Sequence, residues 1–207
     1  MPGLDFGNAP KTFNHFNYQK NDISLKFDFD NKQIKEIKFD IKIAVIIPAY
    51  NESQSIGLVI DSIPKSVDRI IVVDNASTDN TSKIAEKKGA EVVTENRKGY
   101  GYACLKGLEH LAQNNPDIVV FLDGDYSDYA EDLDQIVSPI IREEVVFCIG
   151  ARDKKLREKG SLTYQQIFGN KLACFLMKWL YQGKFSDLGP FRAIKWQSLQ
   201  ELKMEDK

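Results

Sequence analysis

The stretch 117–126, DIVVFLDGDY, joins a run of apolar residues to two carboxylates separated by one glycine. The apolar run, residues 118–122, indicates a strand that is buried on both faces, as the strands of a parallel sheet are. Asp123 and Asp125 follow at once, and two carboxylates held this close repel each other unless a cation neutralises them. The stretch therefore predicts a parallel sheet with a cation-dependent ligand site at the end of one strand.

The same order of strand and helix recurs from residue 41 onward. Short apolar runs predict strands, and the segments between them have the period of amphipathic helices. The expected strands are 43–47, 69–73, 91–94, 118–122 and 145–149, and the expected helices are 53–63, 78–88, 101–114 and 130–142. This alternation predicts an α/β fold with a mostly parallel central sheet flanked by helices, and ligands bind such sheets beyond the carboxyl ends of the strands.

Residues 1–40 differ in character from the rest and are rich in Asn, Lys and Phe. Alternating apolar and polar residues in 23–29 and 33–39, on either side of the turn at 30–32, predict a β-hairpin. We expect an N-terminal extension, 1–40, that adds this hairpin at an edge of the sheet, followed by one domain at 41–207.

The composition of the 207-residue chain, 43% hydrophobic and 28% charged, is that of a soluble globular protein. A net charge of −2 gives no support to a nucleic-acid partner. The three cysteines are far apart and have no Cys-x-x-Cys spacing, which argues against a disulfide framework or a thiolate zinc site. The sequence has no secretory signal and no apolar run of roughly 18–20 residues, so we expect a cytoplasmic protein that does not cross a bilayer.

Polar side chains follow three of the predicted strands: PAYNE at 48–52, DNASTD at 74–79, and DGD at 123–125. Helix capping is one explanation for several of them, with Asn51 or Ser53 at the first helix and residues 77–79 at the second. Capping does not explain Asp74, which comes directly after a buried strand, or the pair at 123–125. These residues are therefore candidates for ligand binding.

Asp-x-Asp occurs three times, but only 123–125 follows a buried strand and contains a glycine, which permits a tight turn and a close approach of a ligand. Hard oxygen ligands suit Mg²⁺ or Mn²⁺, which completes its shell with waters and phosphate oxygens. We predict that Asp125 and Asp123 hold Mg²⁺ or Mn²⁺ and that this metal in turn holds a diphosphate.

The stretch 96–102, NRKGYGY, lies between a strand and a helix and carries two glycines. A dinucleotide fingerprint would need a third glycine where Cys104 stands, and it would normally follow the first strand of the sheet. We interpret the glycines as freeing the backbone so that Arg97 and Lys98 lie beside an anionic ligand.

Five blocks, in this order and at these separations, together resemble one family: VIIPAYNES, IIVVDNASTDNT, GYGYACLKGL, VVFLDGDYSD and SDLGPFRAI. The chain resembles the family 2 glycosyltransferases with the GT-A fold, and in particular the branch similar to dolichyl-phosphate mannose and glucose synthases. The resemblance runs from about residue 42 to residue 202. It implies an inverting, metal-dependent hexosyltransferase of cell envelope biosynthesis, with a UDP-sugar favoured as donor over a GDP-sugar.

The resemblance also implies roles for individual residues. The donor nucleotide is implied to contact Pro48, Ala49, Tyr50, Asn51, Glu52, Asp74, Asn75, Arg97, Lys98, Asp123 and Gly124. Asp187 and Arg192, from the last block, are the implied catalytic residues, with Arg192 contacting phosphate. A hydroxyl acceptor needs a general base, for which Asp187 is the candidate, whereas a phosphate acceptor needs none and Asp187 would then orient a loop or Arg192.

The acceptor implied by the resemblance is a polyprenyl phosphate or another lipid or glycan. Residues 126–130 are YSDYA, where polyprenyl-phosphate mannose synthases usually have Leu-Gln-His-Pro-Pro, so the resemblance to those enzymes does not extend to this segment. The segment 164–181 predicts a long helix with a broad apolar side, which either packs in the core or meets a lipid acceptor at the membrane surface. The chain also ends earlier than such relatives, which indicates a truncated chain or a minimal member.

Two other functions fit part of the pattern. A sugar-1-phosphate nucleotidyltransferase also joins an α/β sheet to a metal and a nucleotide, but it usually has a glycine-rich basic loop after its first strand, where this chain has PAYNE. A nucleotide-sugar-binding module without efficient transfer is the alternative outside catalysis.

Overall fold

The computed structural model describes residues 23–28, 33–38, 41–150 and 189–204. The chain divides into two compact units, one of residues 1–16 and 149–190 and the other of residues 17–148 and 191–207. Nearly all described residues belong to the second unit, and the fold and the candidate site below are those of that unit.

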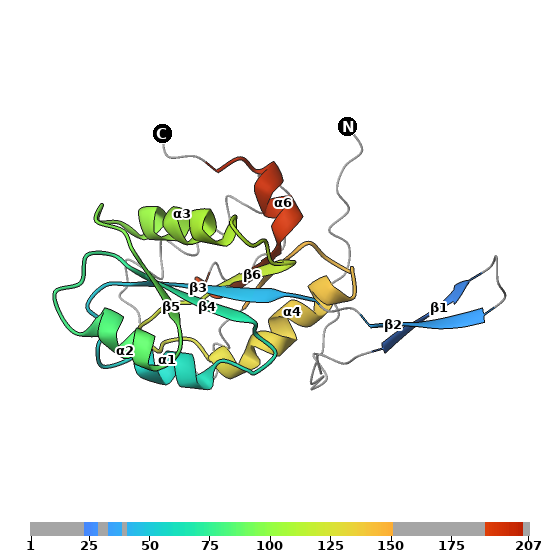
Figure 1. Ribbon diagram of the computed structural model, residues 1–207, viewed down its shortest axis with the longest axis horizontal. Coiled ribbons are helices and arrows are strands. Elements are labelled where there is room, and N and C mark those ends of the chain that lie inside the picture. Colours follow the sequence, from blue (N-terminus) through green and yellow to red (C-terminus); the bar gives the residue numbers. More distant parts are fainter. Residues whose placement is uncertain (1–22, 29–32, 39–40, 151–188, 205–207) are drawn as a thin grey trace. The chain divides into compact units, whose positions relative to one another are not determined.

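The central sheet has six strands in the order β5-β4-β3-β6-β8-β7 (Figure 1). The strands are β3 (Ile43–Ala49), β4 (Arg69–Asp74), β5 (Glu91–Thr94), β6 (Ile118–Phe121), β7 (Phe147–Ile149) and β8 (Arg192–Lys195). β3 pairs in parallel with β4 and with β6, and β4 pairs in parallel with β5. β8 is antiparallel to β6. The predicted α/β fold with a mostly parallel sheet is confirmed.

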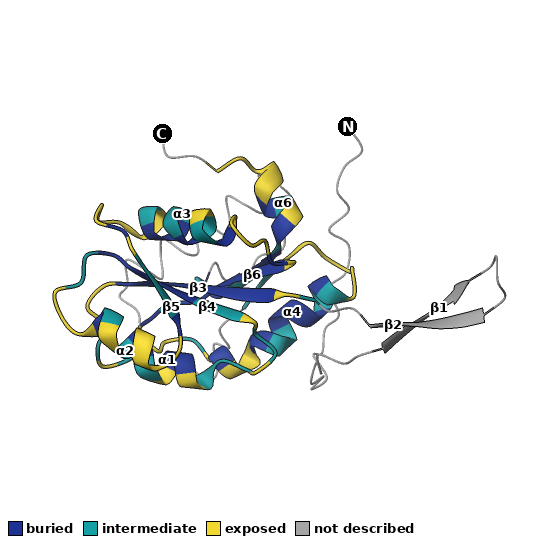
Figure 2. Cartoon of the chain, in the orientation of Figure 1, coloured by how far each residue is buried: buried dark blue, intermediate teal, exposed yellow. Residues whose placement is uncertain are grey.

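Helices cover both faces of this sheet. They are α1 (Ile56–Ser62), α2 (Thr81–Lys87), α3 (Tyr100–Leu111), α4 (Leu133–Ile141) and α6 (Trp196–Glu201), with a 3₁₀ turn η1 (Ala130–Asp132) before α4. One apolar cluster joins the sheet to α1, α2 and α4, and the other joins it to α3 and α6. Figure 2 shows the consequence, with β3 buried and exposed residues on the outer sides of the helices.

The sequence of β3 is apolar without alternation because the strand has core on both of its faces. Ile43, Val45 and Ile47 belong to the cluster under α1, α2 and α4, whereas Ala44 and Ile46 belong to the cluster under α3 and α6. Both faces of the strand are therefore core, and burial stabilises the fold by about 1.5–3 kcal/mol for each of its large aliphatic side chains on either face.

Helix α3 lies directly on the sheet. A Cβ atom built at Gly107 would lie 2.7 Å from Cγ2 of Ile46, which is closer than real Cβ atoms come, and 3.2 Å from Cγ2 of Val73, which is a tight contact. The missing side chain thus lets the helix backbone approach β3 and β4. This close contact fixes the height of the first turn of α3 above the carboxyl ends of the strands.

The direction in which successive strands are added to the sheet reverses at β3. The connection after β3 leads to β4 on one side, whereas β6 lies on the other side of β3. Loops that follow β3 and β6 therefore diverge, and this arrangement leaves a crevice at the carboxyl ends of the two strands. Because β8 is antiparallel to β6, its first residue, Arg192, pairs with Phe121 at the end of β6 and lies at the same rim.

The N-terminal hairpin is formed by β1 (Ile23–Asp28) and β2 (Gln33–Lys38), which are antiparallel with Ile23 opposite Lys38. The predicted hairpin is therefore present. Its strands form a two-stranded sheet. The predicted place of the hairpin at an edge of the domain's sheet stays a prediction. The division into an extension and a domain near residue 40 stays a prediction.

None of the helices in the described ranges has the length and hydropathy that a bilayer crossing requires. The segment 164–181, for which a long helix with an apolar side is predicted, lies outside the described residues.

Candidate active site

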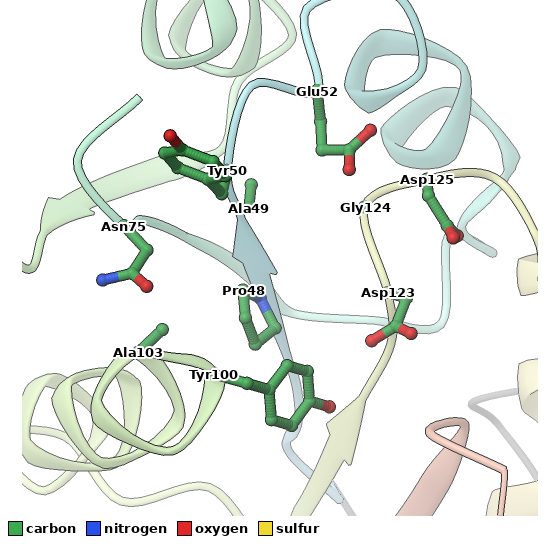
Figure 3. Close-up of a pocket in the computed structure, with 10 residues that line it drawn as sticks. All are labelled: Pro48, Ala49, Tyr50, Glu52, Asn75, Tyr100, Ala103, Asp123, Gly124 and Asp125. Carbon is green, nitrogen blue, oxygen red and sulfur yellow. The ribbon is translucent and has the colours of Figure 1, made fainter. Parts of the chain in front are cut away.

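A cavity of about 230 Å³ opens at the carboxyl ends of β3 and β6 (Figure 3). Its lining residues are Pro48, Ala49, Tyr50, Glu52, Asn75, Tyr100, Ala103, Asp123, Gly124 and Asp125. The structure therefore brings the predicted loops at 48–52 and 123–125 together around one space. Tyr100 and Ala103, from the first turn of α3, line the cavity without having been predicted as site residues.

Asn51 does not line the cavity but joins two of the loops that surround it. Its backbone N–H donates to Oγ of Ser77 at 3.0 Å, and its Oδ1 accepts from the backbone N–H of Thr78 at 2.8 Å. The residue has a φ of 58°, in the left-handed region that asparagine tolerates better than most residues. The interpretation of Asn51, Ser77 and Thr78 as helix caps is therefore wrong, because they bind one another across the loops.

The other predicted caps are shifted in the same way. Helices α1 and α2 begin after Ser55 and Asn80, and neither side chain makes a capping hydrogen bond. The backbone N–H of Ser53 donates to Oδ2 of Asp79 at 3.1 Å, which again joins the loop after β3 to the loop after β4. Asp79 also accepts from the backbone N–H of Thr81 at 2.9 Å, so it does serve the first turn of α2.

Asp74, the last residue of β4, is buried, and both of its carboxylate oxygens accept hydrogen bonds within the fold. Oδ1 accepts from the backbone N–H of Ser77 at 3.0 Å, and Oδ2 accepts from Oγ of Ser82 at 2.6 Å. The inference that local structure could not explain this aspartate is therefore wrong. Its predicted contact with a donor nucleotide stays a prediction, since each carboxylate oxygen has a second lone pair.

Asn75 holds the loop that leads from β5 to α3. Its backbone N–H donates to the carbonyl of Ala49 at 2.8 Å, and its Nδ2 donates to the carbonyls of Glu95 and Arg97 at 3.0 and 2.7 Å. Its Oδ1 accepts from the backbone N–H of Gly99 at 2.7 Å. The side chain is buried and therefore ties three backbone groups of this loop to the rim of the cavity.

Arg97 and Lys98, predicted to lie beside the donor, are placed differently from each other. The guanidinium of Arg97 pairs with the carboxylate of Glu95 at 3.0 Å, lowering the pKa of Glu95 to about 2, and lies 4.5 Å from the ring centroid of Tyr102. Arg97 lines a separate groove between α3 and α6. Lys98 reaches the cavity wall, because its Nζ donates to the hydroxyl of Tyr50 at 3.1 Å and lies 4.9 Å from that ring.

The loop after β6 presents Asp123 and Asp125 to the cavity, and Oδ1 of Asp125 accepts from the backbone N–H of Ser127 at 2.9 Å. The residue with a positive φ in this loop is Tyr126, at 63°, and not Gly124. A Cβ atom built at Gly124 would make only ordinary contacts, the nearest at 3.4 Å from Cγ of Glu52. The turn therefore does not itself require a glycine at this position, and the predicted close approach of a ligand to Gly124 stays a prediction.

The oxygen atoms that the protein offers as metal ligands at the rim suit a cation that takes few of its ligands from protein. Within the described ranges, no group of three or more His, Cys, Asp or Glu side chains could hold a metal ion. Asp123 and Asp125 supply hard oxygen atoms beside an open cavity, and Mg²⁺ and similar ions bind one or two carboxylates and take their other ligands from waters and phosphates. The residues present therefore fit Mg²⁺ or Mn²⁺ accompanied by a phosphate-bearing ligand.

Of the two predicted catalytic residues, Arg192 lies at this rim, and Asp187 lies outside the described residues. The charge of Arg192 acts on two side chains of the first turns of α3, because it favours the ionised forms of Tyr100 and Cys104. Arg192 therefore supplies positive charge near Tyr100, at the α3 side of the cavity.

The sequence matches the family described as Glycosyl transferase family 2 over residues 44–202, which is most of the chain. This chain belongs to glycosyltransferase family 2. The match covers all five of the sequence blocks that resemble this family, including the strand-end loops that line the cavity. The family predicted from those blocks is confirmed.

Two of the curated relatives of this family 2 chain come from archaea. It is 32% identical to an uncharacterized protein of Methanocaldococcus jannaschii over 142 residues, 68% of this chain and 58% of that protein. It is 30% identical to the UDP-N-acetylglucosamine–dolichyl-phosphate N-acetylglucosaminyltransferase of Methanococcus voltae over 150 residues, 63% of this chain and 60% of that enzyme. The chain therefore matches only about three fifths of the length of these relatives.

Among solved structures, glucosyl-3-phosphoglycerate synthase of Mycobacterium tuberculosis in complex with Mn²⁺, UDP and glucosyl-3-phosphoglycerate is similar at a TM-score of 0.61 and 28% identity. The likeness covers 76% of this chain and 57% of that one. The same synthase has been solved with Mn²⁺ and UDP-glucose, and with Mg²⁺ and UDP. The predicted GT-A fold is confirmed by this likeness.

Proposed function

We propose that this family 2 glycosyltransferase moves a sugar from a UDP-linked donor to an acceptor, with inversion at the anomeric carbon and with Mg²⁺ or Mn²⁺. The observation that carries the proposal is the single cavity at the crevice between β3 and β6, where the 48–52 loop meets Asp123 and Asp125. The similar synthase binds UDP-glucose together with Mn²⁺, which supports the same donor chemistry here.

Asp125 and Asp123 would hold the metal. The metal, when bound, would neutralise the diphosphate and stabilise the negative charge that develops on it as it leaves. Lys98, at the Tyr50 side of the cavity, and Arg192, at the Asp123 side, would add positive charge at opposite walls. Charges that are already positioned at the site cost no reorganisation during the reaction, which is why they favour the transition state.

Transfer with inversion is an in-line displacement, in which an acceptor oxygen attacks the anomeric carbon while the nucleoside diphosphate departs. An acceptor hydroxyl must lose its proton, and Asp187 is our candidate for the general base. A phosphate acceptor is already an anion and needs no base, and Asp187 would then orient its loop or Arg192.

We propose an acceptor that contains a phosphate group, such as a polyprenyl phosphate. Two similar proteins support this class: one is named for transfer to dolichyl phosphate, and the other has been solved with phosphoglyceric acid. The cationic side chain of Arg192 at the rim suits such an acceptor. A lipid-linked acceptor would place the protein at the cytoplasmic face of a membrane, in cell envelope biosynthesis.

Calorimetric titration of the chain with UDP, in buffer that contains Mn²⁺, tests the donor class. We expect saturable binding that falls at least tenfold in affinity when EDTA removes the metal, because the metal joins the diphosphate to the aspartate pair. A parallel titration with GDP distinguishes the base. Absence of binding by both nucleotides with both Mn²⁺ and Mg²⁺ would contradict the proposal.

A further inference from the structure

Tyr100 forms part of the cavity wall, although it was not predicted from the sequence as a site residue. It is the first residue of α3, and its position is set by the preceding Gly99, whose φ is 147° and whose N–H donates to Oδ1 of Asn75. Its side chain lines the cavity and is partly exposed, at 45%. In Figure 3 its hydroxyl points toward the Asp123 side of the cavity and away from Asn75.

The hydroxyl of Tyr100 is a proton donor near neutral pH, because the ordinary pKa of a tyrosine is about 10. Burial raises the pKa of Tyr100 most strongly, and the negative charges that Cys104 and Asp123 can carry raise it further, while Arg192 opposes them. These four side chains therefore lie close enough to act on one another electrostatically. A protonated hydroxyl can donate a hydrogen bond to an anion, whereas a phenolate would repel it.

The present partner of this hydroxyl is a weak one. Tyr100 hydrogen-bonds to the side chain of Cys104, one turn further along α3. Burial raises the pKa of the Cys104 thiol to about 11, so the thiol is uncharged. Thiols are weak donors and weak acceptors, and a phosphate oxygen is a much stronger acceptor. The hydroxyl can therefore exchange this partner for a ligand oxygen at little cost.

We infer that Tyr100 is a positioning residue that donates a hydrogen bond to a diphosphate oxygen of the bound donor. The inference rests on the proposed function, because it takes the diphosphate to lie beside Asp123 and Asp125. Tyr100 and Asp123 line the same cavity, so an oxygen held at Asp123 is within reach of the hydroxyl. Tyr100 would thus hold the leaving group from the α3 side, opposite the wall formed by Lys98 and Tyr50.

Tyr100→Phe tests this inference, since it removes the hydroxyl and keeps the ring. We expect the Kd for UDP with Mn²⁺ to rise about tenfold to a hundredfold, which is the usual loss for one hydrogen bond to a charged group. The Kd for uridine, which lacks the diphosphate, should stay within about twofold, and the melting temperature of the unliganded chain should not change. Tyr129→Phe is the matched control, because Tyr129 is 65% exposed and lies outside the cavity lining.

Cys104→Ala separates a ligand contact from a structural one. It removes the thiol partner, so the Kd for UDP should stay the same or fall. A weakening equal to that of Tyr100→Phe would show that the Tyr100–Cys104 hydrogen bond merely shapes the wall, and would overturn the inference. Unchanged UDP affinity in Tyr100→Phe would also overturn it while leaving the proposed function intact. Failure of the unsubstituted chain to bind UDP or GDP with metal would overturn both.

Discussion

Asp125→Ala lowers the rate of metal-dependent sugar transfer, or of donor hydrolysis in the absence of an acceptor, by at least about a hundredfold in our account. The reason is that Asp125 supplies one of the two carboxylates that we propose to hold the metal, so its loss removes half of the negative charge that this pair would place at the ion. The fold should survive, because the Asp125 side chain is exposed and accepts its hydrogen bond from the backbone N–H of the nearby Ser127. We expect the free energy of unfolding to change by less than about 1 kcal/mol.

The matched control for this substitution is Asp132→Ala. Asp132 belongs to another Asp-x-Asp sequence, 132–134, and is exposed, with its carboxylate accepting from Nε2 of Gln135 at 2.8 Å. Its removal should leave both the reaction rate and the metal dependence unchanged. The rates are measured with UDP-glucose and Mn²⁺, and circular dichroism reports the fold. Near-normal turnover in Asp125→Ala would show that the metal role assigned to this residue is wrong.

Asn75→Ala should lower both the free energy of unfolding and the affinity for the donor, and this is the second large effect that we expect. The change removes the partners of the Glu95 and Arg97 carbonyls and of the Gly99 N–H. Leaving buried polar groups unsatisfied costs about 1–3 kcal/mol each, and some of them can recover water, so we expect a loss of about 2–4 kcal/mol in the free energy of unfolding. Urea denaturation measures this loss.

Donor binding should weaken in the same variant, because the loop that Asn75 ties down leads to Lys98 at the Tyr50 wall and to Tyr100 in the first turn of α3. Asn80→Ala is the control, since Asn80 is exposed and precedes α2 without making a capping hydrogen bond. That change should cost less than about 0.5 kcal/mol. If Asn75→Ala were as stable as Asn80→Ala, the side chain would not be holding the loop.

The sheet was predictable because its inner strands are buried on both faces. β5 was predicted with its observed bounds, and β3, β4 and β6 to within two residues, since continuous apolar runs are unusual outside such strands. β8 was missed because only Ala193 and Ile194 of its four residues are buried and apolar, and Arg192 and Lys195 flank them. A two-residue apolar run has no readable period, so only the pairing with β6 reveals this strand.

The starts of α1 and α2 were predicted three residues too early, for a physical reason that the sequence does not show. Short polar residues before α1 and α2 were expected to serve their own helices, but Asn51 and Ser53 hydrogen-bond to the loop after β4. The sequence has no signal for such contacts between loops, because they depend on β3 and β4 lying side by side. For the same reason it could not show that Asp74 is satisfied within its own loop and α2.

The site residues that follow a strand could be predicted from the sequence. The site residue that begins a helix could not. Asp123 and Asp125 follow a buried run, and this position predicts a place at the ligand-binding edge. Tyr100 gave no such signal, because its place on the cavity wall depends on how closely α3 approaches the sheet at Gly107. Arg192 was selected by family resemblance, and only the antiparallel pairing of β8 with β6 explains why it lies at the same rim.

The metal role of Asp123 and Asp125 can be tested by an anomalous difference map, recorded at the manganese absorption edge from crystals of this chain grown with Mn²⁺ and UDP. We expect a strong peak beside the carboxylates of Asp123 and Asp125, with oxygens of the UDP diphosphate completing the coordination of the same ion. Bound UDP with no peak at that rim, or with both aspartates turned to pair with lysine or arginine side chains, would show that this pair does not hold the metal.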